Sequence, residues 1–397
     1  MATGPLATLQ IVLRPGIIDL GWGHPDPALL PVEALREATG AALTLFGADA
    51  LNYGAARGPG PLIAWLCARI GLTEGRTPAP EELLITGGNS QALDQFCVLH
   101  TRPGDTALVE APTYHLAVKI LRDHPLRLVP VPLDGDGLQV DALERTIARL
   151  KAGGRRPRFL YTIPTYHNPT GTCLSRARRR ALINLAVAED FLIVEDDVYR
   201  ELAYDGPAPP SLWSMAPPGR VMRFGSFAKS VAPGLRLGWA TGDPALLGRM
   251  VGGGLLDSGG GVNHFTAMTM AALCRAGGFE AQVVRLRDAY RTKRDTLHAA
   301  LIEYLPDGCT WAKPEGGFFI WLHLPPGVRA ETVLAATEAA GMAAAPGPRF
   351  FSSKDGEKDG EPAPAGRETM RLAFSYYGPK QLADAARLLG ETLAALT

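Results

Sequence analysis

A lysine and an arginine seven positions apart stand among small and apolar residues in GSFAKSVAPGLRLGW, the segment from Gly225 to Trp239. Neither Lys229 nor Arg236 has an acidic neighbour in the sequence. A lysine is more often a surface residue, but a desolvated lysine beside a second cation has a lowered pKa and becomes a nucleophile toward carbonyl carbons. Arg236 can supply that cation and can hold a phosphate through paired hydrogen bonds, to which Ser226 can add another. The segment therefore suggests a site for an aldehyde with a phosphate group, and pyridoxal phosphate is the common compound of that kind.

Such a cofactor needs a carboxylate that keeps its pyridine nitrogen protonated. Asp196, in EDDVYREL, follows an apolar run and is the candidate, although an aspartate there is more often a helix cap or a solvated acid. Tyr199, three residues later, and Asn168, in PTYHNPTG, could reach the phenolic oxygen of the ring. Taken alone, NPTG indicates only a turn.

A glycine pair precedes a helix-like stretch in TGGNSQALD. Asn89 and Ser90 follow Gly88 at the expected helix start, where free backbone N–H groups can bind a phosphate. A glycine-then-helix pattern is weak evidence by itself. Tyr114, in VEAPTYH, follows another strand-like run and could stack on the ring; considered alone it would be a core residue.

The elements that must position these residues alternate along the chain. Strand-like runs are separated by stretches with helical spacing of apolar residues, such as 175–190. This alternation predicts an α/β fold of parallel strands covered by helices, with chemistry at the carboxyl ends of the strands. A long helix over 280–305, strands in 315–325 and 368–375, and a C-terminal helix predict a second, smaller unit. The strand-like runs of the first unit are Glu82–Gly88, Asp105–Pro112, Arg158–Gly171, Phe191–Leu202 and Val221–Ser230.

Composition excludes several classes of function. The chain has 397 residues, of which 46% are apolar, and its 40 acidic residues balance its 40 basic ones. There is no basic surplus for nucleic acid, and no apolar run approaches the length of a membrane span. The five cysteines are scattered without metal-ligand spacing, so we expect no structural metal and a cytoplasmic location.

Taken together, the motifs SFAKSVAPGLRLGW, EDDVYREL, PTYHNPTG, TGGNSQALD and LNYGAARGPGPL resemble the aspartate-aminotransferase superfamily of pyridoxal-phosphate enzymes, fold type I, the class I/II aminotransferases. GHPDPALLP and VEAPTY make the chain most similar to the branch of 2-aminoadipate, kynurenine and aromatic aminotransferases. The resemblance implies a large domain with a mostly parallel seven-stranded sheet between helices and a smaller α+β domain from both termini. The implied bounds are 1–48 for an N-terminal arm and part of the small domain, 49–285 for the large domain, and 286–397 for the rest.

The resemblance also implies a role for each matched residue in cofactor binding. Lys229 would form the Schiff base with pyridoxal phosphate and move the proton, while Asp196 would pair with the pyridinium. Tyr199 and Asn168 would hold the ring hydroxyl, with Tyr114 against the ring. The implied phosphate ligands are Gly88, Asn89, Ser90, Ser226 and Arg236, together with Tyr53 of the other subunit.

For the substrate and the partner, the resemblance implies a second set of contacts. Arg371, in MRLAFS, would clamp the substrate α-carboxylate, with Gly23 and Asn168 lining the same cup. Because Tyr53 would reach the neighbouring site, a homodimer with shared active sites is implied. The expected reaction moves the α-amino group of an amino acid to a 2-oxo acid.

Two segments depart from the family pattern. LLDSGGGVNHFTA (Leu255–Ala267) contains three consecutive glycines, which favour an open or mobile loop, and it adds His264 as a possible substrate contact or second acid or base. A packed or capping histidine is the commoner case. The insert Ser352–Glu368 precedes Arg371 and could act as a lid.

Two other functions stay open. One is a pyridoxal-phosphate-dependent β- or γ-elimination, replacement or carbon–carbon bond formation, for example on S-adenosylmethionine. The other is the effector domain of a transcription regulator. Such regulators carry a helix-turn-helix domain ahead of the aminotransferase-like part, and only about sixteen residues precede IIDLGWGHPDP, which disfavours that function.

Overall fold

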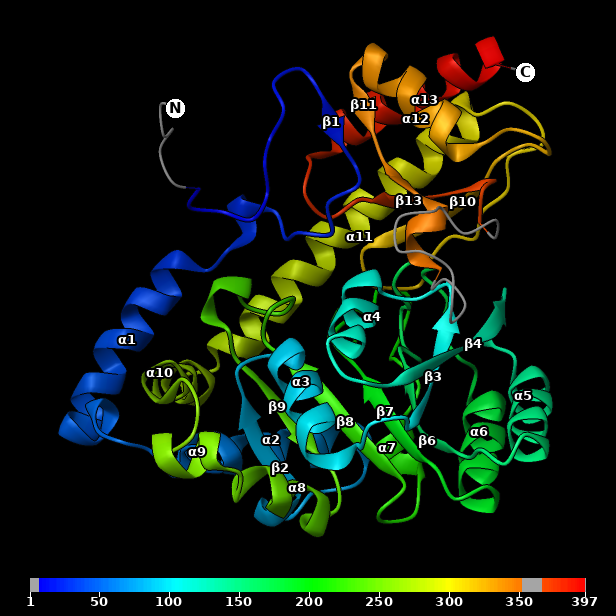
Figure 1. Cartoon of the computed structure of the whole chain (residues 1–397). Helices are drawn as coiled ribbons and strands as arrows, with labels where there is room; N and C mark the ends of the chain where they lie inside the picture. Colours follow the sequence, from blue (N-terminus) through cyan, green and yellow to red (C-terminus); the bar gives the residue numbers. More distant parts are fainter. Residues whose placement is uncertain (1–6, 352–365, 397) are drawn as a thin grey trace, which may run out of the picture.

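The computed structural model describes residues 7–351 and 366–396, and it has two units joined by the long helix α11 (Gly278–Tyr304) (Figure 1). The larger unit is built on one twisted sheet, and the smaller unit lies beyond the far end of α11. Phe279 and Val283, at the start of α11, belong to the core of the larger unit, whereas Leu297 and Leu301 belong to that of the smaller one. The predicted domain boundary at residue 285 therefore falls inside a helix that serves both units, and it stays a prediction.

Within the described residues, the large sheet has eight strands, one more than expected. The additional strand is the two-residue β5, which turns back against the end of β4. In spatial order the strands are β2 (Leu83–Thr86), β9 (Gly238–Thr241), β8 (Val221–Ser226), β7 (Leu192–Asp196), β6 (Pro157–Thr162), β3 (Thr106–Ala111), β4 (Arg127–Asp134) and β5 (Gly137–Leu138).

Strand direction brings the functional residues to one edge of this sheet. β3, β4, β6, β7 and β8 pair in parallel. β9 runs antiparallel to both β2 and β8, so β2 points the same way as β8. The carboxyl ends of all the strands that were predicted to precede chemistry therefore lie at the same edge. Four of the five strand-like runs named from the sequence contain one of these strands, and the fifth, Arg158–Gly171, overlaps all of β6 except Pro157.

Helices cover both faces of the sheet because the strands are apolar on both sides, as β3, with five of its six residues buried, illustrates. One core lies between the sheet and α2, α5, α6, α7 and α10, and the other lies between the opposite face and α3, α4, α8 and α9. The helices of the larger unit are α2 (Gly60–Glu74), α3 (Asn89–His100), α4 (His115–Arg122), α5 (Val140–Ala152), α6 (Arg176–Ala188), α7 (Leu212–Met215), α8 (Pro244–Val251), α9 (Gly254–Gly259) and α10 (His264–Arg275).

Both ends of the chain contribute to the smaller unit, as expected. Its three-stranded antiparallel sheet has the order β10 (Phe319–His323), β13 (Thr369–Ala373) and β12 (Ala345–Pro346). The N-terminal β1 (Ile18–Asp19) pairs with β11 (Met342–Ala343), and α12 (Ala330–Ala340) and α13 (Pro379–Leu396) pack on this unit.

The remaining helix, α1 (Val32–Phe46), packs against α10 at one side of the molecule (Figure 1). Short 3-10 turns occur at η1 (Pro27–Leu29), η2 (Gly47–Leu51), η3 (Pro80–Glu82), η4 (Pro233–Leu235) and η5 (Gly347–Phe350). The expected lid over 352–368 lies outside the described residues from 352 to 365. Across the described ranges, no helix combines the length and apolarity that a membrane crossing requires.

Candidate active site

Sheet register places the elements of an anion site side by side. Gly238 of β9 pairs with Thr86 of β2 on one side and with Ser226 of β8 on the other. The carboxyl ends of β2 and β8 therefore meet across one glycine, and α3 begins at Asn89 just beyond β2. Its first backbone N–H groups have no partner inside the helix and point toward this edge.

Gly88 and Arg236 complete the anion site. Gly88 has a φ of +91°, which favours glycine, and a Cβ there would lie 3.1 Å from Arg236 Nη2, so a larger residue would strain the backbone and push the guanidinium aside. Arg236 donates only long hydrogen bonds, of 3.4 Å, to the carbonyls of Gly87 and Pro233. Within the described residues it has no carboxylate partner, so its charge is available to a phosphate.

Asp196 ends β7 and meets neutral donors. Tyr161 Oη donates to its Oδ2 and Asn89 Nδ2 donates to its Oδ1, both at 2.6 Å. Burial raises the pKa of Asp196 to about 6, against the lowering effect of these two hydrogen bonds. This arrangement refines the prediction for Asn89, because its side chain is committed to Asp196 and only its backbone N–H is left for a phosphate. Tyr161 was missed from the sequence, where the one signal was a buried tyrosine that needs a partner for its hydroxyl.

Lys229 is half-buried, and its Nζ donates to the backbone carbonyl of Gly23 at 2.8 Å. Burial lowers the pKa of Lys229 to about 8, helped by the charges of Arg371 and Arg236. The sequence pointed to Arg236 as the neighbouring cation, and the structure adds Arg371, which comes from the smaller unit. A share of the amine is therefore neutral near physiological pH, as a nucleophile requires.

Arg371 lies in β13, buried between the rings of Phe319 and Phe350, which are 4.2 and 4.7 Å from its guanidinium carbon. Its Nη1 donates to Asn168 Oδ1 at 2.8 Å and its Nη2 to the Gly21 carbonyl at 2.6 Å, while its buried Nε has no partner among the described residues. Burial lowers the pKa of Arg371 to about 10. A buried guanidinium held only by neutral acceptors is suited to binding a carboxylate from outside the chain.

Asn168, Tyr199 and Tyr114 surround the space between these charged groups. Burial raises the pKa of Tyr199, and a hydrogen bond with Asn168 opposes that rise. Burial also raises the pKa of Tyr114, and the charges of Asp196 and Arg371 act on its hydroxyl from two sides. Tyr114 stands at the start of α4, where β3 ends, so its ring can face the same space.

Together these groups fit pyridoxal phosphate. Lys229 offers a nucleophilic amine, Asp196 offers a buried carboxylate with no cation beside it, and Arg236 offers a charge at the start of α3. A Cβ at Gly88 would crowd Arg236, and the buried Oδ1 of Asn89 has no hydrogen-bond partner in the described ranges. The donor set thus matches an aldehyde, a protonated ring nitrogen and a phosphate.

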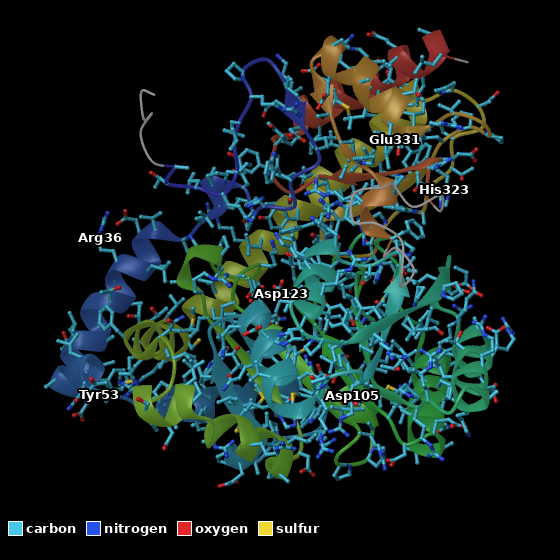
Figure 2. The ribbon with its side chains drawn as sticks, in the orientation of Figure 1. Arg36, Tyr53, Asp105, Asp123, His323 and Glu331 are labelled. Carbon is cyan, nitrogen blue, oxygen red and sulfur yellow. The ribbon has the colours of Figure 1, made fainter. Side chains whose placement is uncertain are left out.

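Two predicted residues lie apart from this cluster. Tyr53 is 83% exposed and lies at the outer edge of the molecule near α1 (Figure 2). His264 begins α10; its Nε2 lies 2.9 Å from the backbone carbonyl of Asp49, and its Nδ1 is buried without a partner. Within one subunit, neither residue contacts the groups around Lys229.

The interpretation of the three-glycine segment as an open loop was wrong. Gly260 and Gly261 have φ values of +66° and +86°, and an added Cβ would lie 2.6 Å from the carbonyl oxygens of Gly54 and Ala55, respectively. The glycines are therefore required for close backbone packing against the segment that carries Tyr53.

Comparison with known proteins agrees with this geometry. Residues 15–354 match the family Aminotransferase class I and II. Aromatic-amino-acid aminotransferase 1 of Thermococcus litoralis is 33% identical over 390 residues, which cover 97% of this chain and 90% of that protein.

Two solved structures show the same fold. The kynurenine aminotransferase of Pyrococcus horikoshii has a TM-score of 0.88 at 33% identity, covering 96% of this chain and 91% of that one. The α-aminoadipate aminotransferase of Thermus thermophilus, complexed with N-(5'-phosphopyridoxyl)-L-leucine, has a TM-score of 0.84 at 32% identity, covering 96% and 94%. The chain therefore belongs to the class I and II aminotransferases and is a pyridoxal-phosphate-dependent enzyme that transfers amino groups between amino acids and 2-oxo acids.

Proposed function

We propose that Lys229, Asp196 and Arg371 divide the work of amino-group transfer. Pyridoxal phosphate, when bound, supplies a protonated conjugated ring that accepts the electron pair left at the substrate α-carbon. Asp196 keeps the proton on the ring nitrogen, Lys229 Nζ takes the proton from the α-carbon, and Arg371 holds the α-carboxylate. The observation that carries this proposal is the buried Asp196 carboxylate, which has neutral donors as its hydrogen-bond partners.

The remaining residues hold the cofactor in register with these three. Tyr199 and Asn168 bind the ring oxygen, and Tyr114 covers the ring. Phosphate binding falls to the N–H groups of Gly88, Asn89 and Ser90 with Ser226 and Arg236. Gly23 lines the substrate cup, where its carbonyl already accepts a hydrogen bond from Lys229.

The amino donors proposed are those with large side chains. The relatives are named for aromatic amino acids, kynurenine and α-aminoadipate, and Phe319 and Phe350 flank the guanidinium of Arg371. The test mixes the cofactor-loaded protein with a panel of amino acids and one 2-oxo acid and identifies the products by mass spectrometry. A keto acid from an aromatic or aminoadipate-like donor is expected, and products of elimination would contradict the assignment.

We also propose a homodimer in which Tyr53 completes the partner's phosphate site. Large apolar side chains are exposed along α1 and η2, beside Tyr53; they include Leu43, Leu45 and Leu51. Monomers rarely leave such a surface uncovered. A cytoplasmic location stays a prediction of the cysteine pattern.

Subunit mixing tests the shared site. Tyr53→Ala and Lys229→Ala are each expected to be nearly inactive, but a hybrid dimer contains one intact site. After subunit exchange at equal amounts, about a quarter of the parental activity should return. Mixing Lys229→Ala with Asp196→Asn is the matched control, because both residues belong to the same subunit's site and no hybrid has an intact one. Equal recovery in both mixtures, or none in either, would contradict the shared site.

Elimination or carbon–carbon bond formation is not favoured. The relatives are aminotransferases, and the histidine that would serve as the additional acid or base packs against the backbone carbonyl of Asp49.

A further inference from the structure

A carboxylate and an imidazole form a buried pair next to Asn168. Glu110 is the fifth residue of β3, and His167 directly precedes Asn168; each has 2% of its side chain exposed. Glu110 Oε2 lies 3.1 Å from His167 Nε2. Glu110 accepts two more hydrogen bonds, from Thr162 Oγ1 at 2.6 Å and from the Ile163 backbone N–H at 2.9 Å. None of the roles proposed above involves Glu110 or His167.

Hydrogen-bond chemistry fixes the protons along this chain of groups. The backbone N–H of Thr170 can only donate, and it points at His167 Nδ1 from 3.4 Å, so Nδ1 is the acceptor and Nε2 carries the proton that faces Glu110. Thr170 Oγ1, at 2.8 Å from Nδ1, then donates to it, and Thr172 Oγ1 donates to Thr170 across 2.7 Å. The imidazole is therefore held at both nitrogens, in one tautomer and one orientation.

The same turn holds Asn168 through its backbone. His167 N–H donates to the Thr172 carbonyl at 2.8 Å, and Gly171 N–H donates to the His167 carbonyl at 2.7 Å. Asn168 extends from this turn to accept a hydrogen bond from Arg371 Nη1 at 2.8 Å, and its amide also bonds to Tyr199. Any rotation of the turn would move the partner of the substrate-binding guanidinium.

We propose that Glu110 and His167 are positioning residues that orient Asn168 and, through it, Arg371 for the substrate carboxylate. Neither is placed to touch the substrate; they act through the turn between residues 167 and 172. The inference rests on the proposed roles of Asn168 and Arg371.

Glu195, on β7, provides a control in the same sheet, where β6 separates it from β3. It is also fully buried, and its two oxygens accept hydrogen bonds from the backbone N–H groups of Leu212 and Trp213, at 2.9 and 3.0 Å. These donors belong to α7, which contributes no residue to the site. Glu110→Gln and Glu195→Gln therefore make the same carboxylate-to-amide change at two buried, hydrogen-bonded sites. Only Glu110 adjoins the turn that carries Asn168, whereas Glu195 lies 3.8 Å from Arg179 Nη1.

The experiment compares both variants and Thr170→Val in the cofactor-loaded enzyme, measuring KM and kcat for the amino donor, the visible spectrum against pH, and Tm. Glu110→Gln should raise KM about tenfold, with a smaller change in kcat, because a neutral amide oxygen accepts more weakly from His167 and Ile163 than a carboxylate oxygen does. Its spectrum should shift, since the Asn168 contact to the ring oxygen moves. Thr170→Val, which removes the hydroxyl that donates to Nδ1 and accepts from Thr172 but leaves Glu110 in place, should raise KM about threefold. Glu195→Gln should change Tm alone.

Parental KM and spectrum in Glu110→Gln, with a Tm loss like that of Glu195→Gln, would show that the pair is only structural. Should Glu110→Gln not fold, Thr170→Val decides the matter, and an unchanged KM and spectrum in it would overturn the proposal. Failure of the proposed function is distinguishable, because then the parent protein itself would show neither visible absorbance with pyridoxal phosphate nor amino-group transfer.

Discussion

Asp196 and Asp197 are consecutive residues at the end of β7, and they face opposite sides of the sheet. Asp196 accepts hydrogen bonds from neutral groups on the cofactor side. Asp197 accepts from the guanidinium groups of Arg200 and Arg223, the second at 2.8 Å. Two buried carboxylates one residue apart thus meet opposite electrostatic surroundings.

Their proton affinities differ accordingly. Burial raises the pKa of Asp196 to about 6. Burial also acts to raise the pKa of Asp197, but the charges of Arg200 and Arg223 outweigh it and lower that pKa. A buried carboxylate without a cation is costly to the fold. The chain therefore completes the ion pair at Asp197, whereas Asp196 accepts hydrogen bonds from neutral groups and is proposed to pair with the pyridinium of the cofactor.

The buried arginines repeat the contrast. Arg223 contacts two carboxylates, Asp197 at 2.8 Å and Glu74 at 3.1 Å. Arg371 is equally buried but has neutral acceptors as its hydrogen-bond partners, at Asn168 and Gly21. Under the proposed roles, buried charges that are paired inside the protein are structural, and the buried charges of Asp196 and Arg371, which are bound by neutral groups, are the ones that bind ligand charges.

The largest effect is expected at Lys229, whose amine is proposed to react with the cofactor. Lys229→Ala should abolish covalent binding of pyridoxal phosphate and all transfer, while leaving Tm of the cofactor-free protein close to the parental value. Borohydride reduction of the loaded parent followed by peptide mapping should find the modification at Lys229. A modified lysine elsewhere, or none, would remove this residue from the mechanism.

Asp196→Asn tests the buried carboxylate that accepts hydrogen bonds from neutral groups. An amide cannot hold the proton on the ring nitrogen, so kcat should fall about a hundredfold or more, which corresponds to a few kcal/mol of lost charge stabilisation. The fold should not suffer, because an uncompensated buried charge is removed. A variant with kcat within threefold of the parent would refute the assigned role.

Asp197→Asn should show the reverse pattern. Removing one partner of a buried ion pair leaves Arg223 and Arg200 under-compensated and should cost about 3–5 kcal/mol of unfolding free energy. Urea titration of the cofactor-free protein measures this loss. Activity per folded molecule should stay near the parental value. If both aspartate variants lost stability and activity to the same degree, the contrast between the two faces would have no functional meaning.

Cofactor uptake should depend on pH through Lys229. Because its pKa is lowered to about 8, about a tenth of the amine is neutral at pH 7 and about nine tenths at pH 9. The rate of uptake by cofactor-free protein, followed by visible absorbance, should therefore rise roughly tenfold over that interval. Arg371→Gln removes a charge that lowers this pKa, so the midpoint should move to higher pH. A midpoint that stays in place would mean that Arg371 does not act on the amine.

Much of this contrast could be predicted from the sequence, and the limits have physical causes. Lys229, Asp196 and Asn168 stand next to strand ends, and parallel strands gather their carboxyl ends at one edge, so local motifs were sufficient to find them. Tyr161 and Glu110 lie inside strands, where tyrosine and an isolated acid carry no distinctive pattern. Their partners come from segments that only the folded chain brings together.

Prediction of the fold shows the same division between features with a local sequence pattern and features that depend on distant segments. Five strands of the large sheet were located from the sequence by their apolar runs, and so was the long helix α11, but β4 (Arg127–Asp134) was missed. β9 was also missed, because Gly238–Thr241 is short and begins with glycine, and its antiparallel direction depends on its pairing with β2 and β8. The role of the paired glycines at 260 and 261 was also hidden, since close backbone packing leaves no trace in local composition.

The smallest effect is expected at His264. It is intermediate between the buried groups that are paired inside the protein and those that are not. One nitrogen is matched with the Asp49 carbonyl at 2.9 Å, and the other is buried without a partner. If buried groups without a hydrogen-bond partner mark ligand contacts, His264 Nδ1 would contact the substrate. If packing beside Gly54 leaves no room for a ligand, the imidazole is structural. An added Cβ at Gly54 would overlap that nitrogen, so this side of the ring is already filled by backbone.

We therefore expect His264→Ala to give the same product at close to the parental kcat and KM, with a modest fall in Tm. Arg371→Ala, measured alongside, should raise KM by at least about tenfold, because every α-amino acid presents the carboxylate that it binds. A changed product or a large loss of kcat in His264→Ala would return the histidine to the reaction and revive the elimination chemistry.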